Sequence, residues 1–302
     1  MASQGSRTAV IAALLANTAI AVAKFVATAI TGSAAMLAEA IHSVADAGNQ
    51  AILLWGMSAS KRPGGATYPF GRGKEVYFWS FIVAVMLFIG GAVFSVQHGV
   101  SALQHPHEVQ NTGISVAVLV GALAFEGSSW FVAVREFNRA RGSRALWRTL
   151  RETKDAPLLV ILFEDSAAMA GLLLALAGIV TTYYTQDPMW DALASILIGI
   201  LLAGVAFFLA FEIKGLLIGE AAGRRDRANI RSRVLAHPNV TAVNRLLTMA
   251  MSPDEMLVNL DIVILRGLSG DQVHQTVGEV EQAIRTAFPS AANIFIETDV
   301  AS

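Results

Sequence analysis

The chain of 302 residues contains no cysteine, which excludes disulfide bonds and metal sites built from thiolates. Charged residues are also scarce: they make up only 15% of the chain, whereas 54% is hydrophobic and the mean hydropathy is +0.54. An ordinary soluble domain carries about 25% charged residues. The composition therefore predicts an integral membrane protein. A formal net charge of -1 gives no reason to expect a nucleic-acid partner.

Six apolar segments reach the roughly 20 residues that a helix needs to cross a bilayer. The sequence after them is polar enough to be soluble. We therefore predict a six-span transmembrane bundle over residues 1–211, followed by a small cytoplasmic domain over residues 212–302. The six segments are Thr8 to Ile30, Ser33 to Met57, Val76 to Val100, Gly113 to Val134, Pro157 to Thr181 and Pro188 to Phe211.

Basic residues predict the orientation of this bundle. The connections after spans one, three and five contain no Lys or Arg, whereas those after spans two and four are rich in both. Basic loops are normally cytoplasmic, so both termini are expected to be cytoplasmic. The basic residues are Lys61, Arg62, Arg72 and Lys74 in one connection and Arg135, Arg139, Arg141, Arg144, Arg148, Arg151 and Lys154 in the other.

Span two carries a polar stripe. His42 and Asp46 lie four residues apart, so their side chains leave a helix on the same face and can share one ligand. Glu39 and Asn49 extend the stripe and are interpreted as possible supporting residues. Ionisable groups inside a membrane are costly and indicate a functional site. Nitrogen and oxygen donors together suit a divalent transition-metal ion.

Other spans bring polar residues to a similar depth. With about 1.5 Å of rise per residue, the predicted topology places Glu126, Glu164 and Asp165 about 18–20 Å from the outer surface, close to His42 and Asp46. Glu164 and Asp165 differ by about 100 degrees around the helix, so only one can point squarely at a shared ion, and either could be that ligand. Glu126 and Asn17 could be supporting residues or structural hydrogen-bonding groups.

Three motifs make the chain resemble the cation diffusion facilitators, a family of proton-coupled divalent-metal exporters. They are LAEAIHSVAD at Leu37 to Asp46, PFGRGKE at Pro69 to Glu75 and DALASILIG at Asp191 to Gly199. The resemblance implies a zinc site between spans two and five, a homodimer, and a metallochaperone-like cytoplasmic domain. It also implies that Lys74 pairs with an acidic group near the end of span six, for which Glu220 is the candidate.

Span five departs from the family pattern, because Glu164 and Asp165 stand where a His-x-x-x-Asp pair is common. The run FEDSAA at Phe163 to Ala168 is similar to a branch that includes the mitochondrial zinc-transporter-like members. Zn²⁺ is the expected substrate. Because a carboxylate-rich site also suits harder ions, Mn²⁺ and Fe²⁺ remain alternatives, and Cd²⁺ and Co²⁺ are possible.

The tail alternates between helical and strand patterns. Residues 224–236 and 271–288 have helical patterns, and residues 240–250, 255–265 and 292–297 read as strands. The order αββαβ predicts a compact α+β domain, which the family resemblance describes as ferredoxin- or metallochaperone-like and dimerising.

The expected function is metal-for-proton antiport by alternating access, in which protons displace the metal from His42 and the carboxylates. A metal-sensing or scaffold membrane protein that transports nothing is the alternative. An enzyme is not expected, because there is no HExxH motif and no second histidine near the site. A bacterial inner membrane is the expected location, since no transit peptide or histidine-rich loop is evident.

Overall fold

The computed structural model describes the backbone of residues 2–31, 34–105, 112–142 and 145–300. Within these ranges, side chains are described for all residues except 2–5, 24, 27–28, 30–31, 34–42, 112, 114–115 and 147–148. The chain divides into two compact units, Met1–Lys214 and Gly215–Ser302.

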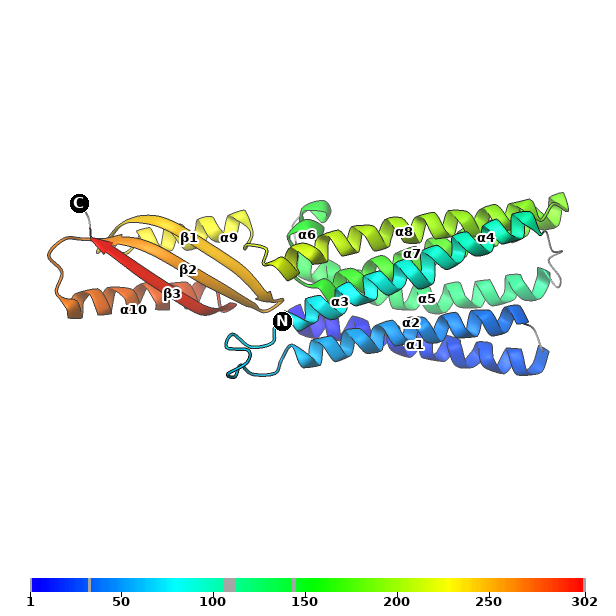
Figure 1. Ribbon diagram of the computed structural model, residues 1–302, viewed down its shortest axis with the longest axis horizontal. Coiled ribbons are helices and arrows are strands. Elements are labelled where there is room, and N and C mark those ends of the chain that lie inside the picture. Colours follow the sequence, from blue (N-terminus) through cyan, green and yellow to red (C-terminus); the bar gives the residue numbers. More distant parts are fainter. Residues whose placement is uncertain (1, 32–33, 106–111, 143–144, 301–302) are drawn as a thin grey trace. The chain divides into compact units, whose positions relative to one another are not determined.

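The first unit is helical throughout its described secondary structure (Figure 1). The third predicted span is one continuous helical stretch, in which a π-helical segment, η1, joins two α-helices. The elements are α1 (Ala2–Thr31), α2 (Ala34–Ala59), α3 (Glu75–Met86), η1 (Leu87–Val93), α4 (Phe94–Gln104), α5 (Thr112–Arg141), α6 (Leu146–Glu152), α7 (Ala156–Thr185) and α8 (Met189–Ile218).

Among the residues searched, five helical stretches are long and apolar enough to cross a membrane. They lie in α1, in the stretch α3–η1–α4, and in α5, α7 and α8. The remaining predicted span forms α2, whose residues 34–42 are outside the described side chains. The predicted helical membrane domain is thereby confirmed, and α6 is a short additional helix between the fourth and fifth predicted spans.

Helices far apart in the sequence lie side by side in this unit. Helix α1 packs against α2, α5 and α7, while α5 also packs against α7 and α2 against α3. This arrangement surrounds the polar residues of spans one, two, four and five with helix on several sides. Polar groups inside a bundle can pair with one another instead of facing lipid.

Helix α8 makes glycine-mediated contacts with α4 and α7. A Cβ atom added to Gly99 would lie 2.6 Å from Cγ1 of Ile196, and one added to Gly178 would lie 2.6 Å from Cβ of Ala194. Small residues allow membrane helices to approach this closely. A glycine of α8 allows the same close approach from its own side: a Cβ added to Gly199 would lie 2.6 Å from Cγ2 of Val96 on α4.

The second unit has the predicted order of elements, which confirms the αββαβ fold class. A three-stranded sheet has the strand order β1-β2-β3, with β1 and β2 antiparallel and β2 and β3 parallel. A turn at Pro253 and Asp254 connects the first two strands. The elements are α9 (Arg224–Leu235), β1 (Val240–Ser252), β2 (Glu255–Ile264), α10 (Gly270–Ala287) and β3 (Ala291–Val300).

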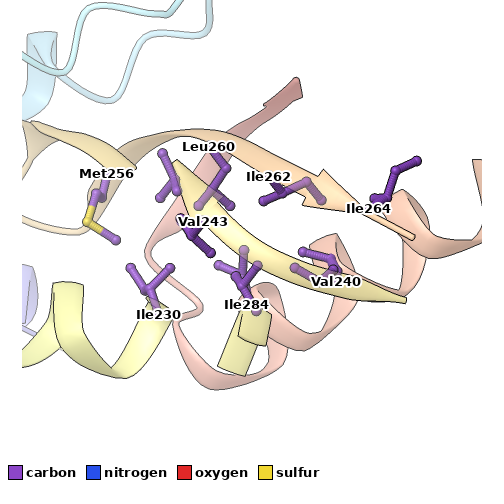
Figure 2. Close-up of a cluster of buried hydrophobic side chains, with 12 residues drawn as sticks. Ile230, Val240, Val243, Met256, Leu260, Ile262, Ile264 and Ile284 are labelled. Atoms are coloured by element: carbon purple, nitrogen blue, oxygen red, sulfur yellow. The ribbon is translucent and has the colours of Figure 1, made fainter. Parts of the chain in front are cut away.

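One face of this sheet and the two helices enclose the hydrophobic core (Figure 2). Alternate residues of β2, including Val258, Leu260 and Ile262, are completely buried and pack with Ile230 of α9 and Ile284 of α10. The alternation of buried and partly exposed residues along β2 is what a strand with one covered face requires.

Local hydrogen bonds fix the ends of the helices in this unit. Ser269 and Gln272 form a capping box at the start of α10. His237, just after α9, lies with Nε2 2.8 Å from Oε2 of Glu279 on α10, and its Nδ1 accepts a hydrogen bond from the backbone N–H of Asn239. The hydrogen bond from His237, assisted by Gln275, lowers the pKa of the Glu279 carboxyl.

Candidate metal site

Helix α7 carries the two carboxyl groups at the centre of the candidate site. Its first turn is fixed by Asp155, whose side chain accepts a hydrogen bond from the backbone N–H of Leu158, and by Pro157. The helix continues for 30 residues, so Glu164 and Asp165 lie well inside it. Both are buried, with 6% and 2% of their surface exposed.

Glu164 is held by two side-chain amides from α2. Asn49 donates from Nδ2 to Oε1 of Glu164 at 3.0 Å, and Gln50 donates from Nε2 to Oε2 at 3.2 Å. Gln50 is completely buried, and its Oε1 accepts a hydrogen bond from Nδ2 of Asn17 at 3.3 Å. This chain of amides connects α1, α2 and α7 through Glu164.

Asp165 is held from a different side. Ser129 of α5 donates from Oγ to Oδ2 of Asp165 at 2.8 Å. The next residue of α5, Trp130, donates from Nε1 to Oγ of Ser166 at 2.9 Å. Adjacent residues on a helix point about 100 degrees apart, and here this divergence directs Glu164 toward α2 and Asp165 toward α5.

Further acidic groups act on this pair. Asp46 of α2 and Glu126 of α5 interact electrostatically with Glu164, and Asp46 also interacts with Asp165. Acidic side chains from α2, α5 and α7 therefore act on one another electrostatically inside the bundle. Such a concentration of negative charge is favourable for a cation and unfavourable without one.

The predicted nitrogen ligand and one supporting residue fall outside the described side chains. His42 and Glu39 are part of helix α2, on the turns that precede Asp46. Within the described residues, no three His, Asp or Glu side chains are grouped closely enough to hold a metal ion. The set His42, Asp46, Glu164 and Asp165 therefore remains a prediction.

Two residues of this network were not among those selected from the sequence. Gln50 follows Asn49 directly, and an amide inside an apolar helix was a usable signal for it. Ser129 lies three residues after Glu126, hence on the same helix face. Serine is common in membrane helices as a packing residue, so its type alone gave no reason to choose it.

Lys74 and Glu220 belong to the two separately described units. Lys74 is the residue preceding α3, where its backbone carbonyl accepts hydrogen bonds from Tyr77 and Phe78. The backbone carbonyl of Glu220 accepts one from Ala250 within the second unit. Their pairing remains a prediction.

Comparison with protein families identifies both units. Residues 10–218 match the family described as the cation efflux transmembrane domain. Residues 223–300 match the family described as the cation efflux protein, cytoplasmic domain.

Three curated proteins illustrate the similarity. The mitochondrial proton-coupled zinc antiporter SLC30A9 of Xenopus laevis is 31% identical to this chain over 272 residues. The match covers 87% of this chain and 48% of that protein. Metal tolerance protein C4 of Arabidopsis thaliana is 34% identical over 231 residues, covering 75% of this chain and 50% of that protein. The cation-efflux pump FieF of Klebsiella pneumoniae is 26% identical over 299 residues, covering 98% and 93%. The chain thus spans about half the length of the first two relatives.

Proposed function

The chain belongs to the cation efflux family, also called the cation diffusion facilitators, and from this premise we propose that it exchanges a divalent metal ion for protons across a membrane. The gathering of Asp46, Glu126, Glu164 and Asp165 in one part of the helical bundle is the observation that carries the proposal. A transporter needs such a site within its membrane domain, and acidic side chains there mark ion and proton pathways.

Zn²⁺ is the proposed substrate. Relatives are named as zinc antiporters, and His42 would add an imidazole nitrogen to the carboxylates, which is a donor set that zinc accepts. The potential metal ligands among the described residues near Glu164 and Asp165 are mainly carboxylate oxygens, so Mn²⁺ and Fe²⁺ are the competing substrates.

Proton coupling follows from the chemistry of these ligands. A carboxylate or an imidazole binds metal only when deprotonated, so metal and protons compete for the same groups. We propose that the site accepts the metal from the cytoplasm, that the helices then change their packing, and that protons displace the ion on the opposite side. This is alternating access with a single shared site.

The decisive experiment measures transport by the protein reconstituted into vesicles, with a metal-sensitive dye and a pH-sensitive dye inside. His42→Ala and Asp46→Ala are expected to abolish metal-driven proton flux while the protein remains folded. His105→Ala is the matched control, because this exposed histidine lies at the end of α4 and outside the site. Flux equal to wild type in both site variants would refute the assignment.

The same experiment tests the alternative function. Reversible metal binding by a wild-type protein that moves neither metal nor protons would identify a metal sensor or scaffold. The hydrogen bonds that already hold both carboxyls of α7 are compatible with that alternative, because they make a stable site without requiring movement.

We further propose that both termini face the cytoplasm and that the protein is a homodimer in a bacterial inner membrane.

A charge interaction between Lys74 and Glu220 would connect the membrane domain to the cytoplasmic domain. If it does, Lys74→Glu and Glu220→Lys should each lower transport, and the double exchange should restore it. Equal loss in the double variant would exclude the pairing.

A further inference from the structure

We propose that Asn49 supplies its side-chain carbonyl oxygen to the transported cation, as a neutral ligand beside the carboxylates. This inference rests on the proposed function and adds a residue to its site. It starts from a property that distinguishes Asn49 from the other amides of the network.

The amide of Asn49 is only half used. Its Nδ2 donates to Oε1 of Glu164 at 3.0 Å, but its Oδ1 is buried and has no hydrogen-bond partner among the described residues. The whole residue is only 5% exposed. Leaving a buried carbonyl oxygen without a hydrogen bond is unfavourable, so a buried oxygen of this kind requires an explanation.

The neighbouring residue shows what a purely structural amide looks like here. Gln50 donates from Nε2 to Oε2 of Glu164 and accepts at Oε1 from Asn17, so both ends of its amide are used. Gln50 and Asn49 therefore each donate one hydrogen bond to Glu164, but they differ in whether the carbonyl oxygen of the amide accepts one. Of these two carbonyl oxygens, only that of Asn49 has no hydrogen-bond partner among the described residues.

The position of this oxygen fits a cation site. Oδ1 belongs to the same amide group whose Nδ2 donates to Glu164, so a cation held at that carboxylate would be near this amide. On α2, Asn49 follows Asp46 by three residues, and this spacing places both on one helix face. The charges of Asp46 and Asp165 act on Glu164 in the same region. A carbonyl oxygen among carboxylates is repelled by them until a cation is bound.

A neutral ligand would have a particular effect on exchange. An amide oxygen has no proton to lose, so it would contribute to metal affinity without adding a proton to the coupled reaction. Carbonyl oxygens suit Mn²⁺ better than Zn²⁺, so this residue would also moderate the preference of the site for zinc.

The test compares two matched variants of the full-length protein in detergent, titrated calorimetrically with Zn²⁺ and with Mn²⁺. Asn49→Leu and Gln50→Leu each remove one amide donor to Glu164, but only the first removes the unpaired oxygen. Asn49→Leu is expected to weaken Zn²⁺ binding about tenfold more than Gln50→Leu does. Equal weakening would show that Asn49 only positions Glu164 and would overturn the inference.

A second pair of variants keeps the inference testable if Asn49→Leu does not fold. Asn49→Asp retains an oxygen at the same place and adds charge, so it is expected to bind both ions and to raise the affinity for Mn²⁺ relative to Zn²⁺. His105→Glu, at an exposed position at the end of α4 and outside the site, is expected to leave that ratio unchanged. The same ratio in both variants would overturn the inference.

The outcomes also separate this inference from the function beneath it. Wild-type transport combined with equivalent effects at positions 49 and 50 would reject the Asn49 ligand alone. A wild-type protein that neither binds Zn²⁺ or Mn²⁺ nor drives proton flux would reject both the function and the ligand.

Discussion

At the scale of single residues, the described hydrogen-bond donors to Glu164 and Asp165 are uncharged. Two amides donate to Glu164 and one hydroxyl donates to Asp165. A carboxylate buried among apolar helices is expensive unless its oxygens are hydrogen-bonded. Neutral donors satisfy those oxygens without cancelling the negative charge, whereas a lysine or arginine would compete with an arriving metal ion. The choice of donors therefore favours a site that receives cations.

Removal of the donor to Asp165 should weaken metal binding. Ser129→Ala removes the 2.8 Å hydrogen bond, so the carboxyl loses its fixed orientation, and we expect about tenfold weaker Zn²⁺ affinity by calorimetry. Ser128→Ala is the matched control, because Ser128 is exposed and donates only to the carbonyl of Phe125 within α5. An equal effect in both variants would contradict a role for the Ser129 hydroxyl.

The polar residues of the candidate site could be selected from the sequence, but their hydrogen-bond partners could not. Asp46, Glu164 and Asp165 were conspicuous because charge is rare and costly inside an apolar span. Glu164 is hydrogen-bonded to α2 and Asp165 to α5, and this choice of partners depends on how each helix is rotated against its neighbours. That rotation is set by packing over the whole bundle, which the local pattern of one helix does not contain. For the same reason, Gln50 and Ser129 became recognisable only in the structure.

At the scale of helices, the third span differs from a uniform α-helix. Its apolar pattern predicted a continuous span, and the structure contains seven π-helical residues, Leu87–Val93, in the middle of it. A π-helical segment changes the rotation of everything that follows it. Seven apolar residues are too few to reveal a different helical period, so the sequence could not predict this segment. After it, α4 presents Val96 and Gly99 to α8.

The glycine contact between these helices predicts a specific loss of stability. In Gly199→Ala the new Cβ would lie 2.6 Å from Cγ2 of Val96 and 2.9 Å from the backbone oxygen of Ala92. Because the backbone atom cannot move aside, the helices must separate, at a cost of about 1–3 kcal/mol. The measurement is the unfolding midpoint in detergent. Gly204→Ala on the same helix is the control, since a Cβ there meets nothing within 4 Å. Similar midpoints for the two variants would show that the contact is not tight.

At the scale of the whole molecule, the cytoplasmic unit has one sheet face covered by its own helices and one that is not. The register places Leu247 of β1, Asn259 of β2 and Phe295 of β3 in one row across the sheet. This row lies on the face opposite the buried residues Val258 and Leu260. Leu247 is 50% exposed and Phe295 is 49% exposed. Exposed apolar side chains grouped on a sheet suit contact with a second protein surface.

We expect this face to contribute to the proposed homodimer. Leu247→Asp would bring a charge into an apolar contact and should shift the full-length protein from dimer to monomer in detergent, as measured by light scattering after size exclusion. Arg233→Asp is a suitable control, because this exposed residue of α9 also changes charge but lies on a helix that covers the other face of the sheet. A dimer that persists in Leu247→Asp at the wild-type association constant would place the contact elsewhere. A dimer lost equally in both variants would indicate a general effect of negative charge on this unit. Selective loss in Leu247→Asp, with the sheet still folded by circular dichroism, is the result that a contact through Leu247 and Phe295 requires.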